Sequence, residues 1–137
     1  MKPTTFIEDG KCLYNYGNEY NKPYFEHMQR IDSQLIKQIP DKSGICHHMM
    51  FETKYINELI TKIEENHNDT FYNVFLKNVS KEHIEHSGAS EYEIYFNYIL
   101  LKHPEKIKIR QLKWMNCDRL ILNNDYDYIS IHWYNRL

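Results

Sequence analysis

Residues 87–102 read SGASEYEIYFNYILLK, and this stretch predicts a helix that begins at Ser90. Ser90 and Glu93 have the spacing of a capping box, in which each side chain accepts a hydrogen bond from the other residue's backbone N–H. The helix is expected to end before Pro104, because proline disfavours a helical conformation in the residue that precedes it. The first turn also carries a second acidic residue, Glu91, so the same stretch is a candidate functional site.

The two glutamates of this helix have different expected roles. Glu93 belongs to the capping box, which is a structural explanation for it. The residues that share a helix face with Glu91 are Ile94, Tyr95, Tyr98 and Ile99. Glu91 is therefore expected at the first-turn end of the buried face, where the helix N-terminus favours the ionised carboxylate that a general base requires. An acidic residue that only complements the helix dipole gives the same pattern, so both interpretations stay open.

Helices and strands alternate along the rest of the chain. Helical spacing predicts three further helices, at residues 23–37, 54–66 and 70–78. Strands are expected at residues 11–16, 44–51 (GICHHMMF), 107–115 (IKIRQLKWM), 118–125 and 127–134. This order predicts one domain, residues 1–137, of α/β class with mixed α+β character, and its last strands are expected to be antiparallel.

Composition and charge exclude several classes of protein. The net charge of −2, with acidic and basic residues mixed, argues against nucleic-acid binding through a positive field and against an electrostatic membrane anchor. No apolar run is long enough for a transmembrane span, and the N-terminus does not resemble a signal peptide. Three cysteines without a CxxC pair predict reduced thiols and a cytoplasmic location. The 12 tyrosines suit a surface that binds polar ligands such as sugars, although an AT-rich genome gives the same composition.

Histidine and aspartate residues supply further candidates. On a strand, His47 and His48 point to opposite faces, so we expect one to be packed and the other to face a cleft. His132 is expected on a polar strand face together with Tyr128 and Ser130, and it is a better ligand candidate than most of the other histidines. Asp125 and Asp127 have DxD spacing, but a turn explains them at least as well. The histidines expected at the surface are His27, His67, His83, His86 and His103.

Four stretches in a set order resemble a group of glycosyltransferase-like proteins of bacteria and large DNA viruses, within the GT-A superfamily of nucleotide-sugar transferases. They are SGICHHMMF (43–51), IEENH (63–67), SGASEYEIYFNYIL (87–100) and IRQLKWMN (109–116). The resemblance spans residues 3–134, and HHM and SEYE are its most specific parts. It implies a central mixed sheet flanked by helices and transfer of a sugar from a nucleotide-sugar donor to a hydroxyl (glycan) acceptor.

The same resemblance implies roles for individual residues. Glu91 would be the catalytic base or would contact the acceptor hydroxyl. His132 would complete the coordination of a manganese or magnesium ion, since hard cations suit the oxygens of a diphosphate. The residues implied on the acceptor side of the cleft are His47, His48, Ser90, Tyr92 and Glu93.

One departure from the family bears on function. Family members have an upstream half, built from βαβ units, that holds the nucleotide and ends in a DxD, whereas residues 2–15 here resemble the segment that follows it. Asp125 and Asp127 lie too late in the chain to replace this upstream DxD. We therefore expect the acceptor-side, C-terminal half of the fold, with the nucleotide-binding half absent. A partner chain that supplies this half is one way to complete the enzyme. The alternatives are an inactive half-domain that binds a glycan or a partner subunit, and an unrelated small metal-binding protein.

Overall fold

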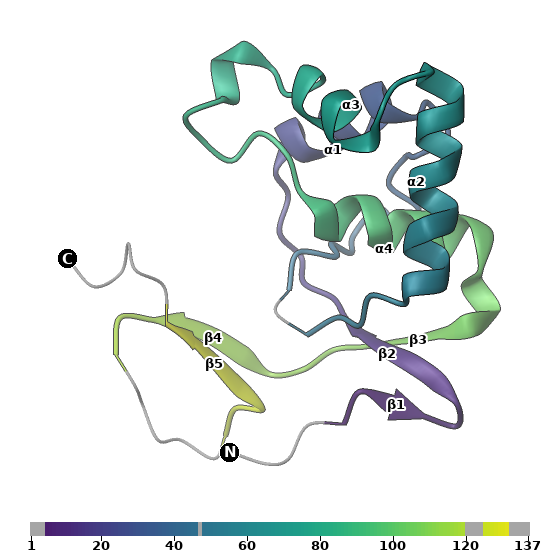
Figure 1. Ribbon diagram of the computed structural model, residues 1–137. Coiled ribbons are helices and arrows are strands. Elements are labelled where there is room, and N and C mark those ends of the chain that lie inside the picture. Colours follow the sequence, from purple (N-terminus) through teal and green to yellow (C-terminus); the bar gives the residue numbers. More distant parts are fainter. Residues whose placement is uncertain (1–4, 47, 120–124, 132–137) are drawn as a thin grey trace.

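A computed structural model describes residues 5–46, 48–119 and 125–131 (Figure 1). Its α-helices are α1 (Lys22–Ile31), α2 (Thr53–His67), α3 (Phe71–Lys77) and α4 (Glu91–Lys102). Two short 3-10 helices are η1 (Lys81–His83) and η2 (Pro104–Lys106). The strands are β1 (Ile7–Glu8), β2 (Lys11–Asn15), β3 (Ile107–Arg110), β4 (Trp114–Cys117) and β5 (Tyr128–Ile131). The predicted class, a mixture of helices and strands, is confirmed at this level.

The strands form two small sheets. β2 lies between β1, which is antiparallel to it, and β3, which is parallel to it. The register pairs Cys12 with Ile107 and Tyr14 with Ile109, and these four side chains belong to the hydrophobic core or pack against it. The helices lie on one side of this sheet (Figure 1). β4 and β5 form a separate parallel pair. β5 is thus parallel to β4, where the last strands were expected to be antiparallel. Most of the strand expected at residues 118–125 lies outside the described residues, so its pairing with the strand expected at 127–134 stays a prediction.

Helix α4 lies at the centre of the core, with α1 and α2 packed against it and α3 packed against α2. Its buried residues are Glu93, Ile94, Tyr95, Phe96, Asn97, Tyr98 and Ile99. Such a helix is buried nearly all round, and its sequence is correspondingly apolar on most sides. Because α4 contacts several other elements, its first turn has a well-defined position within the fold.

The predicted helices are confirmed for α2, α3 and α4, whose ends differ from the expected ones by at most one residue. The helix predicted at residues 23–37 is too long, because α1 ends at Ile31. Asp32 stops it: its carboxylate accepts the N–H of Gln34 at 2.9 Å, and its backbone carbonyl accepts the N–H of Leu35 at 2.8 Å. Aspartate competes for backbone donors in this way and so favours turns over helix interiors.

Two predicted strands differ from the structure. The segment at 44–51 is not a strand in its described residues; it runs beside β2, where the Asn15 N–H donates to the His48 carbonyl at 3.1 Å. The strand predicted at 107–115 is divided into β3 and β4. At the break, the buried Asn15 side chain accepts the N–H of Leu112 at 2.9 Å and donates to the Tyr128 hydroxyl at 3.0 Å. A buried amide thus replaces backbone pairing at this point.

The three cysteines, Cys12, Cys46 and Cys117, are free thiols, and all are buried. Burial raises the pKa of the Cys46 thiol to about 11, and the thiol donates to the Asn15 carbonyl at 2.9 Å. A thiol that is protonated at neutral pH is a poor nucleophile. No helix in the described part of the chain is long and apolar enough to cross a membrane.

Candidate functional site

The first turn of α4 places its two glutamates in opposite environments. Ser90 caps the helix, and its hydroxyl oxygen accepts the N–H of Glu93 at 3.3 Å, as predicted. The Glu93 carboxylate does not return to Ser90. It accepts hydrogen bonds from the Ser43 hydroxyl, from the Gly44 N–H at 3.0 Å and from the Asn97 side chain at 2.9 Å. The predicted capping box is therefore only half formed, and the Glu93 side chain has a different role.

Glu93 holds the segment that follows α1 against α4. Its side chain has no exposed surface. Burial raises the pKa of the Glu93 carboxyl, against the opposing effect of the hydrogen bonds from Ser43 and Asn97. The Asn97 side chain continues the network, because its oxygen accepts the N–H of Gln38 at 2.8 Å. Glu93 is thus a structural residue that no ligand reaches in this conformation.

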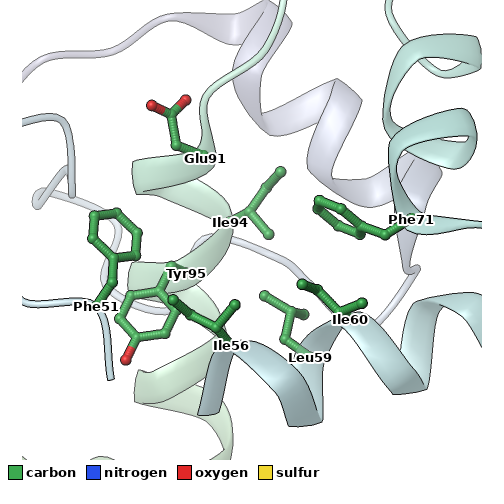
Figure 2. A pocket seen from close by; sticks show the side chains of 8 residues that line it. All are labelled: Phe51, Ile56, Leu59, Ile60, Phe71, Glu91, Ile94 and Tyr95. Atoms are coloured by element: carbon green, nitrogen blue, oxygen red, sulfur yellow. The ribbon is translucent and has the colours of Figure 1, made fainter. Parts of the chain in front are cut away.

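Glu91, in contrast, is exposed, and its carboxylate has no hydrogen bond or ion pair with any residue that the structure describes. It lies at the edge of an apolar pocket of about 320 Å³ (Figure 2). Its carboxylate points away from the apolar side chains, whereas helical spacing placed Glu91 on the buried face. The other residues that line the pocket are Phe51, Ile56, Leu59, Ile60, Phe71, Ile94 and Tyr95.

The aromatic side chains beside Glu91 come from two segments. Phe51, in the segment before α2, is 36% exposed and meets the Tyr92 ring edge-on, with ring centroids 5.2 Å apart. The Phe51 and Tyr95 rings are 4.8 Å apart. The Tyr95 hydroxyl is already bonded, because it accepts the Glu52 N–H at 2.9 Å and lies 3.3 Å from the Tyr14 hydroxyl. Phe51 and Tyr92 are thus in contact with each other and partly exposed, and Phe51 lines the same pocket as Glu91.

His48 is packed and does not line this pocket. Its ring is 5% exposed and stacks on Phe6, with ring centroids 4.0 Å apart. Burial lowers the pKa of His48, and the charge of Arg110 lowers it further. The neutral imidazole therefore accepts from the Arg110 guanidinium, whose Nη2 lies 3.4 Å from His48 Nε2. His47 lies outside the described residues.

The candidate metal ligands from the sequence are Asp125, Asp127 and His132, and the structure describes only the two aspartates. No group of three or more His, Cys, Asp or Glu side chains among residues 5–46, 48–119 and 125–131 could hold a metal ion. Asp127 is bonded to the backbone on both sides of Lys113: its carboxylate accepts the Lys113 N–H at 2.8 Å, and its own N–H donates to the Lys113 carbonyl at 2.7 Å. His132 lies outside the described residues, so its role as a ligand stays a prediction.

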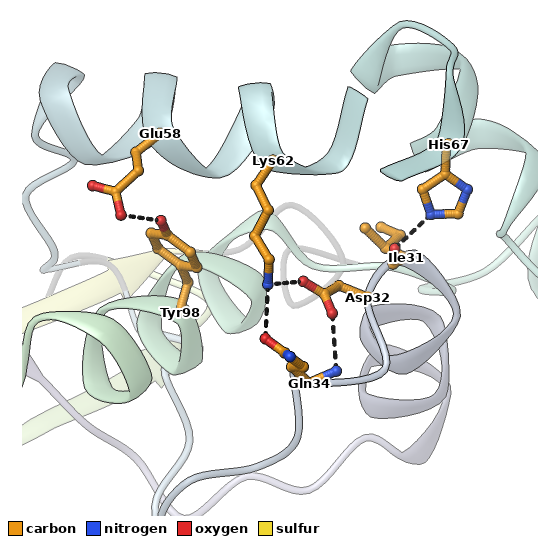
Figure 3. Close-up of polar contacts among 7 residues, drawn as sticks. All are labelled: Ile31, Asp32, Gln34, Glu58, Lys62, His67 and Tyr98. Carbon is orange, nitrogen blue, oxygen red and sulfur yellow. Dashed lines mark hydrogen bonds and ion pairs between the residues drawn. The ribbon is translucent and has the colours of Figure 1, made fainter. Parts of the chain in front are cut away.

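A second set of polar residues joins α2 to its neighbours (Figure 3). Glu58 accepts the Tyr98 hydroxyl at 2.7 Å and lies 3.0 Å from the His103 ring nitrogen. Lys62 forms an ion pair with Asp32 in the turn after α1. Glu58, Lys62 and Tyr98 line an open groove, but the side chains of the set are bonded to one another rather than directed at a ligand. We interpret the set as structural.

The ion pair between Lys62 and Asp32 is expected to stabilise the folded protein. Burial alone would raise the pKa of Asp32, but hydrogen bonds from Lys62 and the Gln34 N–H outweigh it and hold the pKa below its usual value. We expect Lys62→Met to lower the free energy of unfolding by about 1–2 kcal/mol at pH 7, because the Asp32 side chain is only 5% exposed. Lys81→Met, which replaces an exposed lysine, is the control, and urea denaturation measures the stability of both variants.

The pH dependence of this loss has a defined sign. A carboxyl group with a lowered folded-state pKa stabilises the protein above its unfolded pKa and loses this effect as the pH falls through the folded value. The difference between the wild type and Lys62→Met should therefore shrink below the ordinary aspartate pKa of about 3.9. If Lys62→Met and Lys81→Met lower the free energy of unfolding equally at pH 7, the ion pair contributes nothing to stability.

One buried histidine contradicts the prediction from sequence. His27, expected at the surface, has no exposed area, and its Nε2–H donates to the Phe75 carbonyl at 2.8 Å. The signal that could have found it is helical spacing, because His27 lies four residues before the buried Ile31. His27 therefore joins α1 to α3 and is not part of the pocket.

Comparisons of the chain with known protein families, with curated proteins and with solved structures give no match. The function is therefore inferred from the chemistry of the site and from the resemblance seen in the sequence.

Proposed function

We propose that this chain is the acceptor-binding part of a glycosyltransferase and that Glu91 binds the acceptor hydroxyl group. The observation that carries the proposal is the contrast between the two glutamates of α4. Glu93 is buried and fully bonded, whereas Glu91 is exposed beside Phe51 and Tyr92 with no partner in the described part of the chain. Of the two, only Glu91 can reach a ligand.

The position of Glu91 suits this role chemically. It is the first residue of α4, and a helix N-terminus favours negative charge. An ionised carboxylate accepts hydrogen bonds from hydroxyl groups, and aromatic rings such as Phe51 and Tyr92 supply an apolar surface with a polar edge nearby. The first turn of α4 therefore offers both kinds of contact that a sugar-like alcohol needs.

In the proposed reaction Glu91 acts on the acceptor alone. It orients the acceptor hydroxyl and takes its proton as the oxygen bonds to the anomeric carbon of the donor sugar, while the bond from that carbon to the diphosphate breaks. The nucleotide-sugar donor would be held by a nucleotide-binding half, which another segment or a partner chain supplies. A manganese or magnesium ion would supply charge for the leaving diphosphate. The described residues do not make up its site, so no step here depends on it.

A titration with saccharides tests this proposal. We expect at least one of a panel of monosaccharides and disaccharides to shift the amide NMR signals of Phe51, Glu91 and Tyr92 in the ¹⁵N-labelled chain. Glu91→Gln should weaken that binding about tenfold, because a hydrogen bond to a charged group contributes about 1.5–3 kcal/mol. Glu85→Gln is the matched control, since Glu85 is exposed and the change in charge is the same. The proposal fails if no saccharide shifts these signals, or if both variants weaken binding equally.

A further inference from the structure

The apolar pocket beside Glu91 indicates which part of an acceptor could enter it. Its inner surface consists of aliphatic and aromatic groups. Tyr95 contributes its ring, while its hydroxyl is bonded to Glu52 and Tyr14. A sugar ring placed inside would bury several hydroxyl groups without partners, which is unfavourable. A hydrocarbon group meets no such penalty.

The walls of the pocket are parts of the hydrophobic core. Leu59 on α2 is 4% exposed and Ile94 on α4 is 2% exposed, so a hydrocarbon group bound here would extend existing core contacts. The volume of about 320 Å³ lies at the lower end of the range for small-molecule pockets, roughly 300–1,000 Å³. It therefore suits one short hydrocarbon group better than a helix of a partner protein.

The polar end of such a ligand has one evident partner. Figure 2 shows the Glu91 carboxylate at the edge of the pocket, directed away from Ile94 and the other apolar side chains. A ligand whose hydrocarbon group lies among Ile56, Ile60 and Ile94 would leave its polar end at this edge. A hydroxyl there can donate to the carboxylate, as the charge of Glu91 favours.

We infer, on the basis of the proposed function, that the acceptor is an amphipathic alcohol, with a hydrocarbon group that fills the pocket and a hydroxyl-bearing end that meets Glu91. The substrate class is thus an alkyl or lipid-linked glycoside or alcohol, which should bind at the same site more tightly than a free, fully polar sugar. Each methylene group that enters the pocket should strengthen binding by about fourfold.

Two glucosides that differ only in their alkyl group test this inference. We expect octyl β-D-glucoside, kept below its micelle-forming concentration, to bind at least 100-fold more tightly than methyl β-D-glucoside in NMR titrations. The signals that shift should include the methyl groups of Ile56, Ile60 and Ile94. Ile60→Trp should fill the pocket and weaken octyl glucoside binding at least tenfold, with no effect on methyl glucoside.

Control measurements separate this inference from the proposed function. Ile56→Trp repeats the blocking test at a second partly exposed wall position, and thermal melting confirms that each variant is folded. Equal affinities for the two glucosides, or octyl binding that neither tryptophan variant weakens, would overturn the inference. If the tryptophan variants abolish octyl binding but Glu91→Gln leaves it unchanged, the pocket inference holds and the role of Glu91 fails. If the two glucosides bind equally and only Glu91→Gln weakens their binding, the role of Glu91 holds and the pocket inference fails.

Discussion

Replacement of Glu93 by alanine is expected to lower the free energy of unfolding by about 3–5 kcal/mol at neutral pH, or to prevent folding. The substitution removes a side chain with no exposed surface and leaves a cavity beside Asn97. It also leaves the Ser43 hydroxyl and the Gly44 N–H, both buried, without their acceptor. The Asn97 side-chain amide loses one of its two acceptors and keeps the backbone carbonyl of residue 93. Each unsatisfied donor costs about 1–3 kcal/mol, partly offset where water enters.

Urea denaturation of three variants measures this effect. Glu93→Gln keeps the volume and one oxygen for Ser43 and Gly44, but its amide group faces the Asn97 donor, so we expect an intermediate loss of about 1–2 kcal/mol. Glu91→Ala, at the exposed neighbour, should change stability by less than about 0.5 kcal/mol. Similar losses for Glu91→Ala and Glu93→Ala would contradict the structural role of Glu93.

The pH dependence of the Glu93 contribution has the opposite sign to that of Asp32. Burial raises the folded-state pKa of Glu93 above its ordinary value of 4.5. The folded state then binds more protons than the unfolded state between the two pKa values. The stability contribution is fully present below 4.5 and is lost as the pH rises through the folded value. The wild type should therefore gain stability relative to Glu93→Gln when the pH is lowered from 7 to about 4.5.

The sequence predicted the position of α4 but not the partners of its side chains. Spacing within one helix identified the cap at Ser90 and the buried run that follows it. Glu93 accepts a hydrogen bond from Ser43, which lies 50 residues earlier in the chain. Local spacing within a helix carries no information about contacts between residues so far apart in the sequence. The break between β3 and β4 was missed for the same reason, since Asn15 lies 97 residues before Leu112.

The candidate site was predicted in part. The residues of the first turn of α4 were identified, but the exposure of Glu91 differs from that expected from helical spacing. The pocket itself could not be predicted, because its walls come from α2, α3, α4 and the segment with Phe51, which meet only in the folded chain. Helical periodicity shows which residues face inward, whereas a gap between helices depends on how their side chains fit.

Gly44→Ala is expected to destabilise the protein by about 3 kcal/mol, although it adds only one methyl group. A Cβ at Gly44 would lie 2.4 Å from the Cβ of Phe96 and 2.7 Å from its Cγ. Phe96 is fully buried in α4, so its ring cannot move aside without disturbing the core. Any shift of the backbone at Gly44 would also lengthen its hydrogen bond to Glu93.

Gly17→Ala is the matched control, because the nearest atom to an added Cβ there is 3.7 Å away, an ordinary contact. We expect its midpoint in urea to stay close to that of the wild type. The cost of Gly44→Ala should fall in a Phe96→Ala background, because the clash is with that ring, and the double-mutant cycle measures the difference. If Gly44→Ala costs as much without the ring as with it, its effect comes from the backbone rather than from contact with α4. If Gly44→Ala is as stable as Gly17→Ala, the segment that contains Gly44 does not pack closely on Phe96 of α4.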